Sequence, residues 1–246
     1  RSGDVSPVEA VQASIDRIER LDGEVNAVVS ERFERALDDA AGDIPDGPFK
    51  GVPFILKDLW TSSANEPMHL GNKALKEMNY ISPVESDLAR RYREAGFIVV
   101  GRSNTPEFGL VGTTEPESYG PSRNPWNTDY GTGGSSGGAA AAVASGMVPS
   151  ANASDGGGSI RIPAAMCGLV GLKPSRGRVP MGPMQEEWGL SIQHVVCHSM
   201  RDAAGILDAT AIPTMGDGLV APRYGQPYID QVGAAPGKLR IGLWNE

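Results

Sequence analysis

Two glycine-rich segments constrain this chain most, because they require a backbone that approaches other groups with no side chain in between. The first is Gly131-Thr-Gly-Gly-Ser-Ser-Gly-Gly138 and the second is Ser154-Asp-Gly-Gly-Gly-Ser159. Glycine accounts for 32 of the 246 residues, against a usual share of about 7%. Twelve of these glycines lie between positions 131 and 177. The excess therefore belongs to one region of the chain.

Composition and charge exclude several classes of protein. The chain carries 22 Lys and Arg against 30 Asp and Glu, a net charge of −8, which argues against broad electrostatic capture of nucleic acid or an anionic membrane. No apolar run approaches the ~20 residues that span a bilayer, and no signal-peptide pattern opens the chain. Cys167 and Cys197 are too few for a disulfide scaffold. We therefore expect a cytoplasmic protein with free thiols and no nucleic-acid or membrane partner.

The two ends of the chain indicate a fragment. The sequence begins at Arg1 without a methionine, so we expect that N-terminal residues are missing. It ends on an alternating apolar run, Leu239-Arg-Ile-Gly-Leu-Trp-Asn-Glu246, which is typical of a β-strand. A natural C-terminus rarely falls just after an unpaired strand.

Hydrophobic periodicity predicts helices and strands in succession. Ser6-Pro-Val-Glu9 has the residues of a helix N-cap, and apolar residues then recur at helical spacing until an expected stop at Gly23. Further helices are expected at 30–41, 86–95, 137–145 and 202–212, strands at 52–56, 97–100, 168–172 and 239–246, and irregular loops at 61–81 and 113–135. The apolar, non-alternating strands indicate helices packed on a sheet.

The first glycine segment matches no nucleotide-binding motif. A phosphate loop needs a Lys before its closing Ser or Thr, and a dinucleotide loop needs Gly-x-Gly-x-x-Gly after a strand. The segment does contain the Gly-x-Ser-x-Gly of a nucleophile elbow, with Ser136 at its centre, but an elbow follows directly on a buried strand. Here loop residues 124–130 come first. Tight turns would explain the glycines, but not two serines in a nearly uncharged stretch.

The second glycine segment has the composition of an oxyanion hole. Consecutive glycines let several backbone N–H groups converge, and Ser159 at the end of the run is placed to attack a carbonyl held there. A serine nucleophile needs a base. The candidate is Lys57, which follows an apolar strand and would be neutral near pH 7 in a desolvated pocket. A simple turn and a solvated lysine are the alternative interpretations.

A third cluster contains side chains that bind metals elsewhere. His194 and His198 lie four residues apart and flank Cys197. No fourth ligand is nearby in the sequence, so we expect no metal site. Near the second glycine segment, Asp155 and Arg161 are expected to brace the loop by hydrogen bonds rather than to transfer protons.

Five segments together resemble the amidase signature family. In chain order they are Gly51-Val-Pro-Phe-Ile-Leu-Lys57-Asp58, Gly101-Arg-Ser-Asn104-Thr-Pro-Glu-Phe108, Tyr119-Gly-Pro-Ser-Arg-Asn-Pro-Trp126-Asn127, Gly133-Gly-Ser-Ser-Gly-Gly138 and Ser154-Asp-Gly-Gly-Gly-Ser-Ile-Arg-Ile-Pro163. The resemblance extends over essentially the whole chain, and Ser135 and Ser159 are separated by the 24 residues of the family motif.

The resemblance implies an α/β fold with a mixed sheet flanked by helices, and hydrolysis of a carboxylic amide through an acyl-enzyme without metal or organic cofactor. By position, Ser159 would be the nucleophile, Ser135 a bridging serine held by a cis peptide bond, and Lys57 the terminal base. The oxyanion hole would be formed by N–H groups of Gly156, Gly157, Gly158 and Ser159. Supporting roles would fall to Ser136, Asp155, Arg161 and Asn104. Asn104 would either contact the substrate or hold the catalytic residues from behind.

The chain departs from the family pattern in a few places. Gly156 stands where many members have Thr or Ile, Ala139 replaces a frequent Ser, and residues 195–198 lack a common Gly-Pro. Family members are also typically about twice as long. We therefore expect residues 1–246 to be the N-terminal and catalytic portion of one amidase signature domain, with its C-terminal part missing.

Two kinds of family member are consistent with these motifs. One is the A subunit of the glutamyl-tRNA(Gln)/aspartyl-tRNA(Asn) amidotransferase, which shares the serine relay and passes ammonia to a partner protein. The other is a stand-alone amidase, and Thr113-Thr-Glu-Pro-Glu-Ser-Tyr119 resembles these more closely, including those acting on nylon oligomers. The expected ligand is a small amide. A second copy of the chain and the remainder of its own chain are left open as partners.

Overall fold

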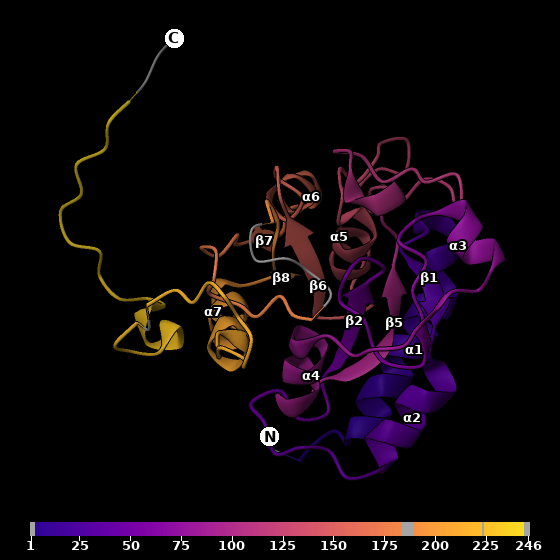
Figure 1. Cartoon of the computed structure of the whole chain (residues 1–246), viewed down its shortest axis with the longest axis horizontal. Coiled ribbons are helices and arrows are strands. Elements are labelled where there is room, and N and C mark those ends of the chain that lie inside the picture. Colours follow the sequence, from indigo (N-terminus) through magenta and orange to yellow (C-terminus); the bar gives the residue numbers. More distant parts are fainter. Residues whose placement is uncertain (1–2, 184–188, 223, 244–246) are drawn as a thin grey trace.

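A mixed six-stranded sheet lies at the centre of the computed structural model, which describes residues 3–183, 189–222 and 224–243. The strand order is β1-β5-β2-β6-β8-β7 (Figure 1). β2 pairs in parallel with β5 and β6, and the other three pairings are antiparallel. The strands are β1 (Val28–Glu31), β2 (Pro53–Lys57), β5 (Ile98–Ser103), β6 (Ser150–Asp155), β7 (Val170–Gly171) and β8 (Ile192–Cys197). The mixed sheet expected from the sequence is confirmed.

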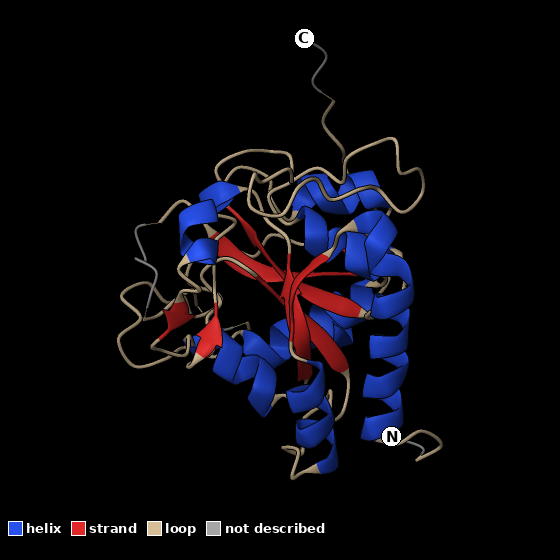
Figure 2. Ribbon diagram, turned by 90° about the vertical axis from the view of Figure 1, so that its right-hand side faces the viewer, coloured by secondary structure: helices blue, strands red, loops and turns tan. Residues whose placement is uncertain are grey.

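Helices cover both faces of this sheet (Figure 2). One face packs against α1 (Pro7–Val25), α2 (Phe33–Ala41) and α5 (Gly137–Ala144), and the other packs against α4 (Asp87–Glu94) and α7 (Met200–Thr210). The smaller elements are β3 (Glu66–Pro67), α3 (Lys73–Glu77), β4 (Ile81–Ser82), α6 (Arg161–Cys167) and the 3-10 turns Glu107–Gly109 and Tyr228–Gln231. None of the described helices is long and apolar enough to cross a membrane.

Strand β2 determines which side of the sheet carries the candidate base. Successive side chains of a strand point to opposite faces. Ile55 packs into the core under α1 and α5, whereas Phe54 and Leu56 pack into the core under α4 and α7. Lys57 therefore shares the face of Ile55 and points toward α5.

The first helix begins as predicted but ends later. The Ser6 hydroxyl accepts a hydrogen bond from the Glu9 N–H at 3.2 Å, and the Glu9 carboxylate accepts one from the Ser6 N–H at 2.8 Å, which completes the capping box. The expected stop at Gly23 is wrong. The helix ends instead where Asn26 takes the left-handed conformation (φ 50°) and donates its N–H to the Asp22 carbonyl.

Other boundaries differ because tertiary pairing outweighs local pattern. The expected helix at 30–41 begins at Phe33, since residues 28–31 pair with β5. The predicted loop at 61–81 holds α3 and the short β3–β4 pair, and the strand expected at 168–172 is reduced to two residues. β6, α6 and β8 were not predicted.

The strand predicted at 239–246 is not formed in its described part. Leu239, Ile241 and Leu243 are exposed and the backbone there pairs with no strand. A strand needs a neighbour for its N–H and C=O groups, and no described residue supplies one. Positions 244–246 lie outside the described residues.

Candidate active site

The side chain of Lys57 ends among three hydroxyl groups. Its Nζ lies 2.7 Å from the Ser135 Oγ, 2.9 Å from the Ser136 Oγ and 2.9 Å from the Ser154 Oγ. The side chain is fully buried. It stands at the carboxyl end of β2, and Ser154 stands near the end of the parallel strand β6. The structure thus brings together the two residues that sequence analysis linked, Lys57 and Ser135.

Burial favours the neutral form of this amine. Removal from water holds the pKa of Lys57 well below its usual value, although the negative charge of Asp155 acts in the opposite direction. A neutral amine has one lone pair and two N–H donors. It can therefore accept a hydrogen bond from one of the three hydroxyls and donate to the other two. The alternative of a solvated lysine does not fit this site.

Ser135 stands on a turn that leaves no room for side chains. Its peptide bond to Gly134 is cis, as the family resemblance implied. A Cβ on Gly134 would collide with the backbone of Thr113, and a Cβ on Gly138 would collide with the backbone of Asn104. Ser135 and Ser136 are buried, and α5 behind them is buried over its first seven residues. Gly134 and Gly138 are thus needed for close backbone packing.

Ser136 ties this turn to the neighbouring strand. Its Oγ accepts from the Ser154 N–H and donates to the Ser154 carbonyl, both at 3.2 Å. Its own N–H donates to the carbonyl of Ser159 at 3.3 Å. A backbone hydrogen bond between Ser136 and Ser159 therefore joins the two glycine segments. Between Ser135 Oγ and Ser159 Oγ the structure has no hydrogen bond.

The second glycine segment connects β6 to α6 and is organised by Asp155. The carboxylate accepts hydrogen bonds from the N–H groups of Gly158 at 2.7 Å, Ile160 at 3.2 Å and Arg161 at 3.4 Å. The N–H of Gly158 is thus already engaged. This corrects our expectation that Gly158 donates to an oxyanion. Gly157 is exposed and Gly156 is half-buried, and their N–H groups donate to no described residue.

Arg161 completes the support of Asp155. Its Nε and Nη2 each donate to the carboxylate at 2.9 Å, in a two-pronged ion pair. Burial acts to raise the pKa of Asp155, but the bonds from Arg161 and from the backbone outweigh it and lower that pKa below its ordinary value. The same pairing raises the pKa of Arg161. Both residues brace the loop in this geometry.

Asn104 is fully buried and acts on the loop behind the serines. Its Nδ2 donates to the Gly120 carbonyl and to the Ser122 Oγ, both at 3.0 Å, and its carbonyl accepts from the N–H of Gly138 at 3.2 Å. The expectation of a substrate contact is therefore wrong, because no surface of Asn104 is open. The bracing role remains.

Sequence reasoning missed Ser154 as a partner of Lys57. The residue lies within one of the five motifs, but strand β6 was not predicted and its adjacency to β2 could not be read from the chain. The only signal was the position of Ser154 directly before Asp155.

The histidine and cysteine cluster does not converge on a metal site. His194 points into the core and its Nε2 lies 3.2 Å from the Ala203 carbonyl, whereas the Nε2 of His198 lies 2.9 Å from the Val143 carbonyl. Cys197 also packs against α7, and its Sγ donates to the Ser199 carbonyl at 3.3 Å. Nowhere in the described part of the chain do three or more His, Cys, Asp or Glu side chains gather.

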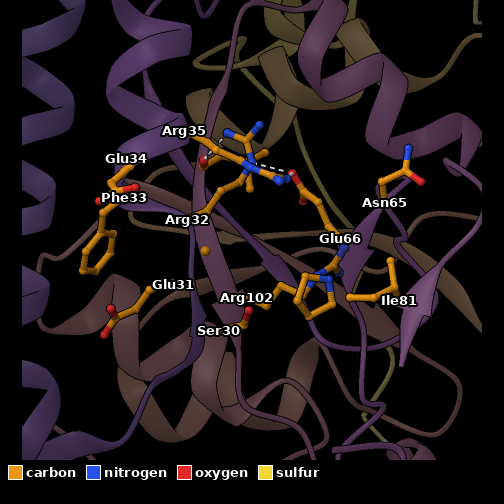
Figure 3. A pocket seen from close by; sticks show the side chains of 13 residues that line it. Ser30, Glu31, Arg32, Phe33, Glu34, Arg35, Asn65, Glu66, Ile81 and Arg102 are labelled. Carbon is orange, nitrogen blue, oxygen red and sulfur yellow. Dashed lines mark hydrogen bonds and ion pairs between the residues drawn. The ribbon is translucent and has the colours of Figure 1, made fainter. Parts of the chain in front are cut away.

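A cavity of about 580 Å³ lies near β1, the start of α2 and the β3–β4 pair (Figure 3). Arg32 spans it to reach Glu66, with Nε 2.5 Å from the carboxylate. Neither Lys57 nor any of the site serines lines this cavity. Within its lining Glu66 pairs with Arg32 and Arg35, and the lining does not include the serine cluster.

Comparison with known proteins identifies the family. The family model described as Amidase matches residues 9–246. The 6-aminohexanoate-cyclic-dimer hydrolase of Paenarthrobacter ureafaciens is 40% identical over 99% of this chain and 50% of its own length. The A subunit of glutamyl-tRNA(Gln) amidotransferase from Chromohalobacter salexigens is 36% identical over 100% of this chain and 51% of its own.

The fold agrees with this comparison. A solved structure of 6-aminohexanoate cyclic dimer hydrolase has a TM-score of 0.94 with this chain at 41% identity, and covers 98% of this chain and 50% of that one. The chain spans about half the length of the curated relatives it matches. Motifs, fold and family model agree over nearly all of its residues, and the chain therefore belongs to the Amidase family.

Proposed function

We propose that this chain carries the catalytic residues of an amidase that hydrolyses a carboxylic amide to an acid and ammonia or an amine. The observation that carries the proposal is the fully buried Lys57 amine, 2.7 Å from the Ser135 hydroxyl and with its pKa lowered by burial. A neutral lysine beside a serine is a base that can receive a proton from it.

In the first half of the reaction, Ser159 is the nucleophile. Its Oγ attacks the amide carbonyl carbon as its proton passes to the Ser135 Oγ, and the proton of Ser135 passes to the Lys57 Nζ. The carbonyl oxygen becomes an oxyanion, which the N–H groups of Gly156, Gly157 and Ser159 stabilise. The C–N bond then breaks, the relay returns one proton to the leaving nitrogen, and an acyl-enzyme remains on Ser159.

In the second half, water replaces the leaving amine. The same relay takes a proton from the attacking water, the second tetrahedral intermediate forms on the same N–H groups, and the ester bond to Ser159 breaks. Ser159 regains its proton and the acid leaves. Every proton in this scheme is carried by side chains of the chain or by substrate and water.

The close approach of the two glycine segments supports the assignment of Ser159. The Ser136 N–H bonds to the Ser159 carbonyl at 3.3 Å, so Ser159 lies next to the serine pair. Hydrogen bonds between catalytic groups are often long without substrate and shorten in the complex. We infer that the Ser135–Ser159 bond forms when a carbonyl occupies the site.

The second candidate function is that of the amidation component of an amidotransferase. Its support is the 36% identity to such a protein, against 40% to a hydrolase of a cyclic amide dimer. The net charge of −8 favours a cytoplasmic amidase acting on a small molecule over a protein with a nucleic-acid partner. Hydrolysis of simple amides by the purified protein without a partner distinguishes the two.

The nucleophile is tested with Ser159→Ala in the full-length protein. We expect loss of amide turnover and of covalent labelling by a fluorophosphonate, because both need the Ser159 Oγ. The matched control is Ser145→Ala, which removes a serine at the end of α5 whose hydroxyl only bonds carbonyls of its own helix, that of Ala141 at 2.7 Å first among them, and should leave both unchanged. Labelling of the Ser159→Ala protein at the wild-type rate would mean that another residue is the nucleophile.

A further inference from the structure

Ile162 occupies a position that the catalytic relay does not explain. It lies in the first turn of α6, three residues after Ser159, and its N–H donates to the Gly158 carbonyl at 2.6 Å. Ile162 is 37% exposed, although Gly158 and nearly all of the first glycine segment are buried. A residue so close to the nucleophile with an open apolar surface borders the space where a substrate must sit.

Two glycines from separate segments make room for this side chain, and a third lies in ordinary contact with it. A Cβ on Gly158 would lie 2.7 Å from the Ile162 Cδ1, and a Cβ on Gly133 would lie 2.9 Å from its Cγ2. A Cβ on Gly112 would lie 3.9 Å from the same Cδ1. Gly158 directly precedes Ser159, and Gly133 lies two residues before Ser135. Ile162 is therefore packed against the backbone on which both serines stand.

A second apolar side chain lies on the other side of the same loop. A Cβ on Gly156 would lie 3.5 Å from the Leu190 Cγ, and Leu190 is 75% exposed. The charged residue of this loop, Asp155, is buried and is paired with Arg161 and three backbone N–H groups. The free N–H groups of Gly156 and Gly157 are thus flanked by aliphatic surface.

We propose that Ile162 determines specificity, and that with Leu190 it selects amides whose acyl substituent next to the carbonyl is an uncharged aliphatic chain. This inference rests on the proposed function, since it takes the glycine loop as the place where the carbonyl oxygen binds. An acyl chain that extends from this carbonyl carbon meets the Ile162 side chain on the Gly158 side of the loop. A charged substituent against this aliphatic surface would lose water, and the nearby guanidinium of Arg161 is already paired with Asp155.

The test compares three p-nitroanilides, acetyl, pentanoyl and glutaryl, on the full-length protein. The wild type should prefer pentanoyl over both others in kcat/KM. Ile162→Ala should lower the pentanoyl-to-acetyl ratio about tenfold, mainly through KM, because removed methylenes change discrimination in an apolar pocket by roughly this factor or more. Ile162→Lys should raise the glutaryl-to-pentanoyl ratio of kcat/KM by about tenfold or more. Ile162→Val, which keeps a branched aliphatic side chain, should retain most of the wild-type preference.

Met166→Ala is the matched control. Its Sδ also meets the Gly133 position, at 2.7 Å from a Cβ there, but it lies one helical turn further from Ser159. Met166→Ala should lower kcat/KM for the three anilides by the same factor or leave all three unchanged. A uniform loss in the Ile162 variants, with unchanged ratios, would overturn the specificity role and leave only packing. Absence of hydrolysis and of fluorophosphonate labelling in the wild type would instead refute the proposed function.

Discussion

Asp155→Asn is the substitution that tests most of this site at once. The carboxylate holds five N–H groups, three from the backbone and two from Arg161. An asparagine keeps one acceptor oxygen and turns an NH₂ group toward the donors on the other side. In either orientation at least one backbone N–H loses its acceptor, Gly158 on one side or Ile160 on the other.

The cost follows from that loss. A buried N–H left without a partner destabilises a protein by about 1–3 kcal/mol. The side chain of Arg161 is 54% exposed and regains water, so it adds little. We therefore expect the free energy of unfolding to fall by about 1–3 kcal/mol, measured by urea denaturation near pH 7. The lowered pKa of Asp155 means that its stabilisation is present above about pH 4, the unfolded pKa, and is lost as pH falls through the folded value.

The same variant should change the activity of the full-length protein in two ways. Displacement of the glycine loop should lower kcat by about 100-fold. The negative charge of Asp155 raises the pKa of Lys57, so its removal should move the acidic limb of the kcat/KM profile to lower pH, because Lys57 must be neutral to act as base. Arg161→Met, which keeps the three backbone bonds, should be milder, and Asp46→Asn at the surface should be silent. If the acidic limb of the Asp155→Asn profile moved to higher pH, or if its free energy of unfolding were unchanged, this account of Asp155 would be refuted.

Two further predictions concern the lysine and the glycines. Lys57→Met in the full-length protein should reduce kcat by about 10²–10⁴-fold at every pH, whereas wild-type kcat/KM should rise with pH through the lowered pKa of Lys57; a variant with the wild-type pH profile would contradict the base assignment. Gly138→Ala should destabilise the chain by about 1–3 kcal/mol in urea denaturation, because its Cβ meets the backbone of Asn104. Gly23→Ala, with open space around its Cβ position in the C-terminal half of α1, should instead stabilise it by about 0.5–1 kcal/mol, and equal effects of the two would refute the packing argument.

Local patterns predicted the elements that have strong local signals. The capping box at Ser6 and the buried strand before Lys57 carry their signal in a few adjacent residues, and both were predicted. Strand β6 was missed because Ser150-Ala-Asn-Ala-Ser-Asp155 has neither alternation nor large apolar side chains. Its small residues are buried under α5, which depends on packing and not on propensity.

The candidate site shows the same division. The five family motifs located Lys57, Ser135 and Ser159 in sequence, and the structure places them on neighbouring segments. The contact from Ser154 to Lys57 and the bond from Gly158 to Asp155 depend on which strands are neighbours and on where a carboxylate points. Neither property is written in the spacing of residues.

The distances in sequence between the partners of Lys57 also bear on how the chain folds. Its bonds to Ser135 and Ser154 join residues 78 and 97 positions apart, across parallel strands that cannot form a local hairpin. Non-local pairings of this kind form slowly and late. We therefore expect the lysine to stay in water, and protonated, until β2, β6 and the serine turn have assembled. Release of its proton and the appearance of a competent site would then mark completion of the sheet during refolding.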